Sequence, residues 1–412
     1  MEMEEARRKV WERGKGRRLD HLPDGLIDAA WIWFVLRVGL GLFALVLFIR
    51  GGLPGPCNSD LVINGWKTFP PLDDRGIAFP LIGVWQHWDA CWYSKIAAHG
   101  YEAGASSTNF FPLLPLLMGA GSSVLGGDVA LAGLVVNAGA LVVGLTGLWQ
   151  LVHEDFDAAT ADRTILYVAV FPAAFFFFAP FTEALFLACA VWAVLGARRG
   201  DWELAALAGF LAGLTRPQGF ILFLPLGWEA ARVLRERWRV AEPGTRRLGW
   251  RDLAPVLAAA APLVAFAAYV AFTALVVGQS FIESHGTWAS TGLHLPWEPL
   301  ALAWVRVIQE HDAVTLLNLG ALIVFGVLFA MGIRRLPMSY SLYVLPQFGL
   351  IVATYPAWPL MSTMRYLLVM FPCFVVLALA GRRKHLHTGW LVLSILFLGL
   401  LTALFLQGNF VG

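Results

Sequence analysis

The sequence predicts an all-α protein that crosses a membrane many times, and three observations support this fold class. Of the 412 residues, 58% are hydrophobic and only 14% are charged, whereas a soluble domain carries about 25% charged residues. Apolar runs recur along the whole chain, and a helix needs about 20 apolar residues to cross a bilayer. Many of the 18 tryptophans lie near the ends of these runs, where interfacial anchoring accounts for them.

The apolar runs predict about ten or eleven transmembrane helices. We interpret the first run as a retained span, because it is too long for the core of a signal peptide. Thr215, Arg216 and Pro217 interrupt a later run, so we expect a break there. The spans are expected at residues 28–50, 110–126, 129–152, 163–180, 182–197, 203–235, 253–277, 313–333, 339–354, 364–381 and 389–407.

Clusters of lysine and arginine predict which loops are cytoplasmic. We expect a basic cytoplasmic N-terminus at residues 1–27, followed by a single transmembrane domain at 28–412 that contains a cytoplasmic loop at 232–252. The loops at 51–109 and 278–312 carry few cations, so both are expected to be external. Three further clusters fit the cytoplasmic side: Arg198–Arg199, Arg334–Arg335 and Arg382–Lys384.

The region 110–197 does not fit a simple alternation of sides. Counting crossings from the N-terminus puts the acidic segment His153–Asp162 outside, but placing Arg198 and Arg199 inside then requires one crossing more or fewer. We therefore expect a re-entrant or half-spanning segment between residues 110 and 197, and the sequence does not indicate which one.

The first external loop contains a segment with helical periodicity. Apolar residues recur near helical spacing, and the polar residues between them predict an amphipathic helix on the membrane surface. The apolar positions are Ile82, Trp85, Trp88, Trp92, Tyr93 and Ile96. The loop also holds Cys57 and Cys91, which can form a disulfide on an oxidising side. Cys189 and Cys373 lie in apolar runs, where packing is the expected role.

Asp89 is the candidate catalytic residue. One interpretation is a surface acid or a helix cap on the interfacial helix. The other is a general base, since a positioned carboxylate can take the proton from a sugar hydroxyl, and neighbouring aromatics such as Trp88 and Tyr101 can stack on sugar rings. A glycosidase needs two carboxylates at a set separation, and the sequence pairs neither Glu102 nor Glu183 with Asp89.

Arg216 and Arg365 are candidate phosphate ligands. Arginine within or beside an apolar run is unfavourable unless it snorkels or is paired, and a guanidinium suits bidentate contact with phosphate. Snorkelling is the alternative for both, and Arg37 is a weaker third case. Glu183 follows Thr182 at an expected helix start, where it can favour the helix dipole, orient Arg216 or bind a sugar hydroxyl.

No cofactor is expected, and the sequence leaves the metal requirement open. Five histidines lie in the expected external loops, but none shows the close, regular spacing of a metal site. They are His87, His99, His285, His294 and His311. The glycine fingerprints of nucleotide-binding loops are absent, and we expect no nucleic-acid partner.

Several segments, each weak alone, occur in an order that resembles a known family. They are His87–Ala90, Ile96–Ala97, His99–Tyr101, Phe110–Pro112 with Pro115, Thr182–Phe186, Thr215–Arg216 with Gly219, and Arg365–Tyr366 with Phe371–Pro372. Together they resemble the GPI mannosyltransferases that add the second mannose, and the bacterial relatives of these enzymes. Members of this family are membrane glycosyltransferases of the GT-C type.

The resemblance implies a GT-C architecture and an inverting transfer of mannose from a polyprenyl-phosphate donor to a hydroxyl on the external side. By the family pattern, Asp89 is the base, and Arg216 and Arg365 face the donor phosphate. Substrate contacts are expected at His87, Trp88, His99, Tyr101, Glu183, Gln218 and Tyr366. The family has Ser-Asn where this chain has Pro217-Gln218, and Glu102 directly follows Tyr101, so the acceptor is left open between a glycolipid and another envelope glycan.

Three alternatives accompany this prediction. The first is a transporter or lipid flippase without transferase activity, although no internal repeat is evident and the polar groups gather at one membrane face. The second is a catalytically silent GT-C subunit, against which Asp89 argues. The third is another sugar, glucose or arabinose, in place of mannose. The expected location is a bacterial plasma membrane, with the active site facing outside.

Overall fold

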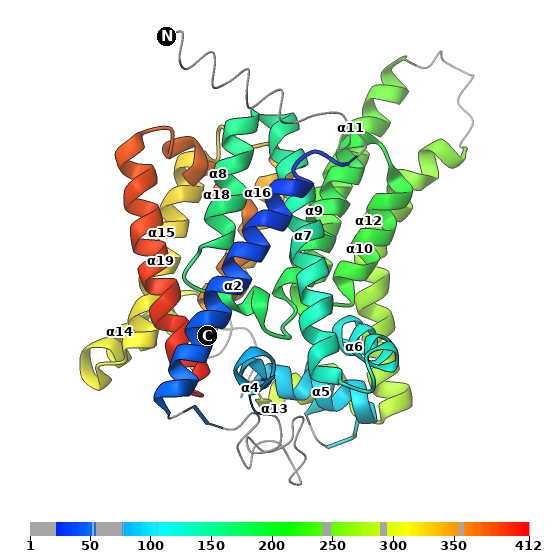
Figure 1. Ribbon diagram of the computed structural model, residues 1–412. Coiled ribbons are helices and arrows are strands. Elements are labelled where there is room, and N and C mark those ends of the chain that lie inside the picture. Colours follow the sequence, from blue (N-terminus) through cyan, green and yellow to red (C-terminus); the bar gives the residue numbers. More distant parts are fainter. Residues whose placement is uncertain are drawn as a thin grey trace.

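The computed structural model describes residues 22–51, 53–54, 76, 78–104, 106–240, 249–288, 295–353 and 358–411. Within these ranges every regular element is helical, and the helices gather into one bundle (Figure 1). Five helices are long and apolar enough to cross a membrane: α2 (Leu26–Arg50), α7 (Val129–Asp155), α12 (Trp250–Phe272) with its π-helical continuation η6 (Thr273–Val277), α15 (Ala313–Gly332) and α19 (Lys384–Leu406). The prediction of an all-α, multi-pass membrane protein is confirmed.

Shorter helices complete the bundle. They are α6 (Leu113–Val124), α8 (Ala158–Ala169), α9 (Glu183–Arg199), α10 (Trp202–Gly213), α11 (Phe223–Val240), α16 (Met338–Ala353), α17 (Thr363–Leu368) and α18 (Phe371–Ala380). Three predicted spans are broken within the described chain. The 3-10 helix η4 (Ala174–Phe178) follows α8, η5 (Pro217–Leu222) separates α10 from α11, and α18 starts anew after α17. Proline accounts for two of these breaks, because it lacks an N–H group and favours the first turn of a helix. Pro217 is the first residue of η5, and Pro372 lies in the first turn of α18.

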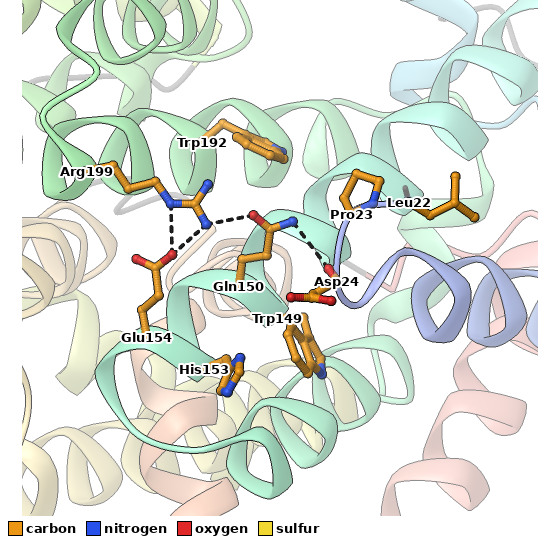
Figure 2. Close-up of a pocket in the computed structure, with 9 residues that line it drawn as sticks. All are labelled: Leu22, Pro23, Asp24, Trp149, Gln150, His153, Glu154, Trp192 and Arg199. Carbon is orange, nitrogen blue, oxygen red and sulfur yellow. Dashed lines mark hydrogen bonds and ion pairs between the residues drawn. The ribbon is translucent and has the colours of Figure 1, made fainter. Parts of the chain in front are cut away.

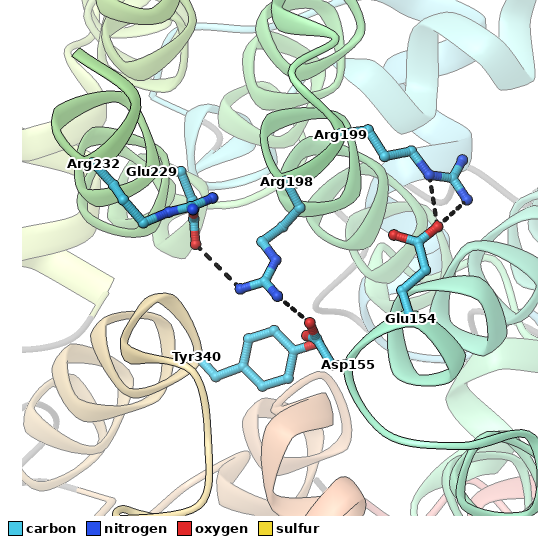
Figure 3. A network of polar contacts seen from close by, with 7 residues as sticks. All are labelled: Glu154, Asp155, Arg198, Arg199, Glu229, Arg232 and Tyr340. Atoms are coloured by element: carbon cyan, nitrogen blue, oxygen red, sulfur yellow. Dashed lines mark hydrogen bonds and ion pairs between the residues drawn. The ribbon is translucent and has the colours of Figure 1, made fainter. Parts of the chain in front are cut away.

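A polar network joins four helices at one end of the bundle, which we call the Arg198 end (Figure 3). Arg198 of α9 pairs with Asp155 at the end of α7 and lies 3.5 Å from Glu229 of α11. The hydroxyl of Tyr340, on α16, donates to Asp155 at 2.7 Å. Helix α2 begins at this same end, since the side chain of Gln150 on α7 donates to the carbonyl of Asp24.

The segment His153–Asp162 also lies at the Arg198 end, so the count that put it on the opposite side from the N-terminus is wrong. The cause is α6, which has 12 residues and is therefore about 18 Å long, too short to cross a hydrocarbon core of about 30 Å. Among the described residues, helix α7 is then the only crossing between the end of α2 and His153. Arg382, which precedes α19, pairs with Asp157 at 2.6 Å, so this basic cluster shares the same end.

The connections from α8 to α9 and from α10 to α11 reverse direction inside the bundle. The side-chain amide of Asn137 on α7 donates to the carbonyl oxygens of Ala179 and Phe181. Irregular backbone at membrane depth needs such partners. Gly219 makes the second reversal tight, because a Cβ there would overlap the backbone of Ala212.

The opposite end, which we call the α5 end, carries shorter elements (lower part of Figure 1). They are α4 (Ala78–Leu81), η2 (Gly83–Trp85), α5 (Asp89–His99), η3 (Ser107–Asn109), α13 (Phe281–Trp288), α14 (Trp297–Val305) and the π-helix η7 (Arg306–Glu310). The helix expected from about Ile82 begins at Asp89, and protein covers most of its surface. Its polar residues have partners within the chain: Ser94 donates to Gln86 at 3.0 Å, and Lys95 lies 2.7 Å from Glu102.

Candidate active site

Asp89 is the first residue of α5, and a strained turn presents it there. Trp88, which precedes it, has a φ of 55°, a left-handed conformation that is unfavourable for a bulky side chain. Such strain, of order 1–3 kcal/mol, persists only where the surroundings enforce it. Here the indole of Trp88 packs edge-on against Phe410, with ring centroids 5.2 Å apart. The turn places the Asp89 carboxylate at a helix N-terminus, where the helix dipole favours an anion.

Arg365 of α17 joins Asp89 to a second carboxylate. Its Nη1 atom lies 2.7 Å from Oδ2 of Asp89, and its Nε atom lies 2.8 Å from Oε1 of Glu183. The guanidinium is also packed against two aromatic rings, with its carbon 4.9 Å from the centroid of Phe176 and 4.8 Å from that of Phe181. Contacts on its edge and on aromatic faces therefore hold this buried cation in one orientation.

Glu183 is fully buried at the start of α9 and extends the row to Arg216. Its Oε1 atom lies 3.5 Å from Nη1 of Arg216. Arg216 also donates from Nε to Oε1 of Gln218 at 3.1 Å, and its guanidinium lies over the ring of Tyr366. Among the described residues, neither Oε2 of Glu183 nor Nη1 of Arg216 has a hydrogen-bond partner.

The four side chains form an alternating row of charges, Asp89–Arg365–Glu183–Arg216, which we call the charge row. Two arginines and two carboxylates give it no formal net charge. Asp89 is its most accessible member: 20% of its side-chain surface is exposed, against 8% for Arg365 and none for Glu183. A partly exposed carboxylate therefore lies next to a guanidinium that is held inside the protein.

Tyr93 belongs to this site, although the sequence pattern predicts it only as part of the apolar face of the helix. It follows Asp89 by one helical turn, is buried, and hydrogen-bonds to the side chain of Thr182. Burial, with further contributions from the charges of Asp89 and Glu183, raises the pKa of its hydroxyl well above the usual range. The i, i+4 spacing from Asp89 is the signal that identifies it.

The structure separates the other predicted site residues from the charge row to different degrees. His87 lies just before Asp89, buried edge-on against Phe405, and burial lowers its pKa to about 4. His99 is exposed at the far end of α5, about 15 Å from Asp89 along the helix. Tyr101 follows it and donates to the carbonyl of Phe110 at 2.7 Å.

Other candidates from the sequence have structural partners or lie outside the described residues. Arg37 of α2 donates to the carbonyl of Leu81 at 2.7 Å and so ties α4 to the bundle. Cys91 is disulfide-bonded, while Cys57 and His294 lie outside the described residues, as does the side chain of His285. Across the described ranges, no group of three His, Cys, Asp or Glu side chains is arranged to hold a metal ion.

A pocket of about 510 Å³ lies at the Arg198 end, away from the charge row (Figure 2). Leu22, Pro23, Asp24, Trp149, Gln150, His153, Glu154, Trp192 and Arg199 line it. Arg199 is engaged there by Glu154 at 2.8 Å and by Gln150 at 2.9 Å. The pocket therefore shares no residue with the site around Asp89.

Comparison with known proteins adds a distant likeness to a solved structure. No protein-family model matches the chain, and neither does any curated protein. The oligosaccharyltransferase of Archaeoglobus fulgidus, solved in complex with zinc and sulfate, is similar over 94% of this chain and 53% of its own, with 14% sequence identity and a TM-score of 0.40. The chain thus spans about half the length of that protein, and the family indicated by the sequence motifs stays a prediction.

Proposed function

We propose that this protein is a membrane glycosyltransferase that moves mannose from a polyprenyl-phosphate donor to a hydroxyl of a glycolipid or envelope-glycan acceptor. The observation that carries the proposal is the contact between Asp89 and Arg365, 2.7 Å apart. An accessible carboxylate and a buried guanidinium are the two groups that this reaction needs side by side.

The chemistry follows from these two groups. Asp89 takes the proton of the acceptor hydroxyl as its oxygen attacks the anomeric carbon from the side opposite the phosphate, so that the configuration inverts. The phosphate leaves as an anion and needs no strong acid from the protein. Arg365 and Arg216 stabilise the charge that develops on it, because fixed guanidinium groups in a buried site act strongly on phosphate oxygens.

The same geometry argues against a glycosidase. Hydrolysis by two carboxylates requires that the second one reach the leaving group or the sugar. Glu183 is the second acid of the charge row, but it is fully buried and bound by Nε of Arg365. Its position suits the holding of cations and leaves Asp89 as the accessible acid of the row.

Two observations support an external position for Asp89. Cys91, two residues further along α5, is disulfide-bonded, and disulfides persist on the oxidising side of a membrane. The basic residues Arg198, Arg199 and Arg382 lie at the opposite end of the bundle, and such residues are enriched on the cytoplasmic side. A lipid-linked donor in the outer leaflet would then meet the α5 end.

A lipid flippase or sugar transporter is the second candidate. The two helix reversals near Glu183 and Arg216 favour it, because interrupted helices with charged residues also form the binding sites of transporters. A flippase would move polyprenyl-phosphate-mannose across proteoliposomes without consuming it. A transferase would instead make a new glycolipid.

The decisive experiment is an assay of purified protein in lipid nanodiscs with polyprenyl-phosphate-mannose and extracted envelope lipids. We expect a lipid product whose mass, read by mass spectrometry, has increased by one hexose, together with free polyprenyl phosphate. Parallel reactions with glucose and arabinose donors test the choice of sugar. Absence of any sugar transfer with all three donors would contradict the proposal.

A further inference from the structure

The charge row is already balanced before any substrate binds. Asp89 and Glu183 together neutralise Arg365 and Arg216. A donor phosphodiester brings one more negative charge, and transfer of the sugar turns it into a phosphate monoester with still more charge. Nη1 of Arg216 has no hydrogen-bond partner among the described residues and can meet the phosphate directly. Nη1 of Arg365 is held by Asp89 and becomes available to the phosphate when that contact opens.

Glu183 is the fixed partner of Arg365. It is fully buried at the first turn of α9 and accepts from Nε at 2.8 Å, while the rings of Phe176 and Phe181 hold the guanidinium. Asp89 is less firmly enclosed than Glu183, because it lies on the short helix α5 and 20% of its side-chain surface is exposed. Asp89 is consequently the partner that Nη1 of Arg365 can leave.

We propose that Arg365 passes from Asp89 to the leaving phosphate as the sugar is transferred, while Glu183 anchors it throughout. This exchange rests on the proposed function. The acceptor oxygen bonds to the anomeric carbon, and the carbon–oxygen bond to phosphate breaks with its electron pair going to the phosphate oxygen. The acceptor proton goes to Asp89. Asp89 thereby loses a negative charge as the phosphate gains one, and Nη1 of Arg365 exchanges its contact with Asp89 for one with the phosphate.

Within the described part of the chain, side chains from α17, α5 and α9 lie near Asp89. Arg365 contacts it from α17, and Tyr93 lies one turn along α5, with Glu183 behind both. Glu183 is a positioning residue, since it acts on substrate through Arg365. Asp89 and Arg365 are the catalytic residues.

A binding measurement tests the exchange without turnover. Asp89→Asn imitates the neutral, protonated base and Asp89→Ala removes the carboxylate altogether, so both should free Nη1 of Arg365 for phosphate. We expect each variant to bind farnesyl phosphate at least fivefold more tightly than the wild-type full chain in detergent, by isothermal titration calorimetry. The gain should vanish when Arg365→Gln is added, because the gain in affinity depends on the guanidinium that Asp89 otherwise holds. Such non-additivity is expected of two residues in direct contact.

Glu102→Gln is the matched control. Glu102 lies at the same end, has 52% of its side chain exposed and pairs with Lys95 instead of Arg365. Removing its charge should leave the affinity for farnesyl phosphate unchanged. An equal gain in Glu102→Gln would assign the effect to general electrostatics and overturn the exchange, as would unchanged or weaker binding in both Asp89 variants.

Glu183→Gln tests the anchor. We expect the gain from Asp89→Asn to shrink in this background, because Arg365 is no longer oriented. If Glu183 had a purely structural role, Glu183→Gln would lower the affinity for farnesyl phosphate equally with and without Asp89→Asn. The gain from Asp89→Asn would then stay intact, which would contradict the anchor. Wild-type transfer together with no gain in the Asp89 variants refutes the exchange alone. A gain without wild-type transfer on any donor refutes the proposed function, and with it the exchange as a reaction step.

Discussion

The Nη1 atom of Arg365 lies 2.7 Å from the Oδ2 atom of Asp89. The two residues come from distant parts of the chain, and one belongs to α17 while the other opens α5. The base and the phosphate ligand of the proposed reaction are therefore supplied by separate elements.

Asp89→Asn should abolish sugar transfer while the protein still inserts and folds. A general base contributes roughly 10²- to 10⁴-fold, so kcat should fall by that order. Turnover of polyprenyl-phosphate-mannose by the purified variant measures the effect, and thermal unfolding in detergent checks its fold. Glu102→Gln, at an exposed acid of the same end, should keep near-normal kcat. Near-normal turnover by Asp89→Asn would remove the base assignment.

Arg216→Ala and Arg365→Ala should weaken donor binding, raising KM for the donor by about tenfold or more, since a charge-assisted contact contributes roughly 1.5–3 kcal/mol. Arg365→Ala should also lower kcat, because the proposed exchange forms a further contact with the phosphate only as the sugar is transferred. The constants come from initial rates at varied donor concentration. Arg199→Ala removes a partly exposed arginine at the Arg198 end and should leave this KM unaltered. If both site variants keep the wild-type donor dependence, the phosphate role is wrong.

Much of the fold follows from hydropathy, but the number of crossings does not. The run at 110–126 looks like a span because a hydropathy window does not see where a helix begins and ends. In the structure Pro112 caps the start of α6, which is only 12 residues long. An apolar helix of 10–14 residues is more often buried than spanning, and this one segment changed the side of His153–Asp162.

The charged members of the site could be found from the sequence, but their pairing could not. Arg216, Arg365 and Glu183 stand out because charges are rare within apolar runs. Arg365 meets Glu183 across 182 positions, a contact that depends on how the bundle brings α17 to the first residue of α9. Tyr93 was missed because an aromatic residue in an apolar pattern looks the same whether it packs in a core or faces a carboxylate.

Arg198→Ala should destabilise the Arg198 end without altering donor binding. Arg198 contacts the carboxylates of Asp155 and Glu229, whose side chains are only 5% and 2% exposed. Removing one partner of a buried ion pair costs about 3–5 kcal/mol, because the other charge is left uncompensated. Thermal unfolding in detergent measures the loss. Arg232→Ala, at a 57% exposed arginine beside Glu229, is the control and should lose under about 1 kcal/mol.

His87 should make stability depend on pH between about 6.5 and 4. Burial lowers its pKa from 6.5 to about 4 in the folded protein, so below pH 6.5 the unfolded chain binds a proton that the folded chain does not. Stability is then complete above pH 6.5 and falls as the pH drops towards 4, by at most roughly 3 kcal/mol. His87→Gln cannot titrate and lacks this loss. The variant's lower free energy of unfolding, relative to wild type, should therefore come closer to the wild-type value from pH 7 to pH 4. Thermal unfolding across this range measures the difference. If it stays constant with pH, His87 is not a buried neutral group.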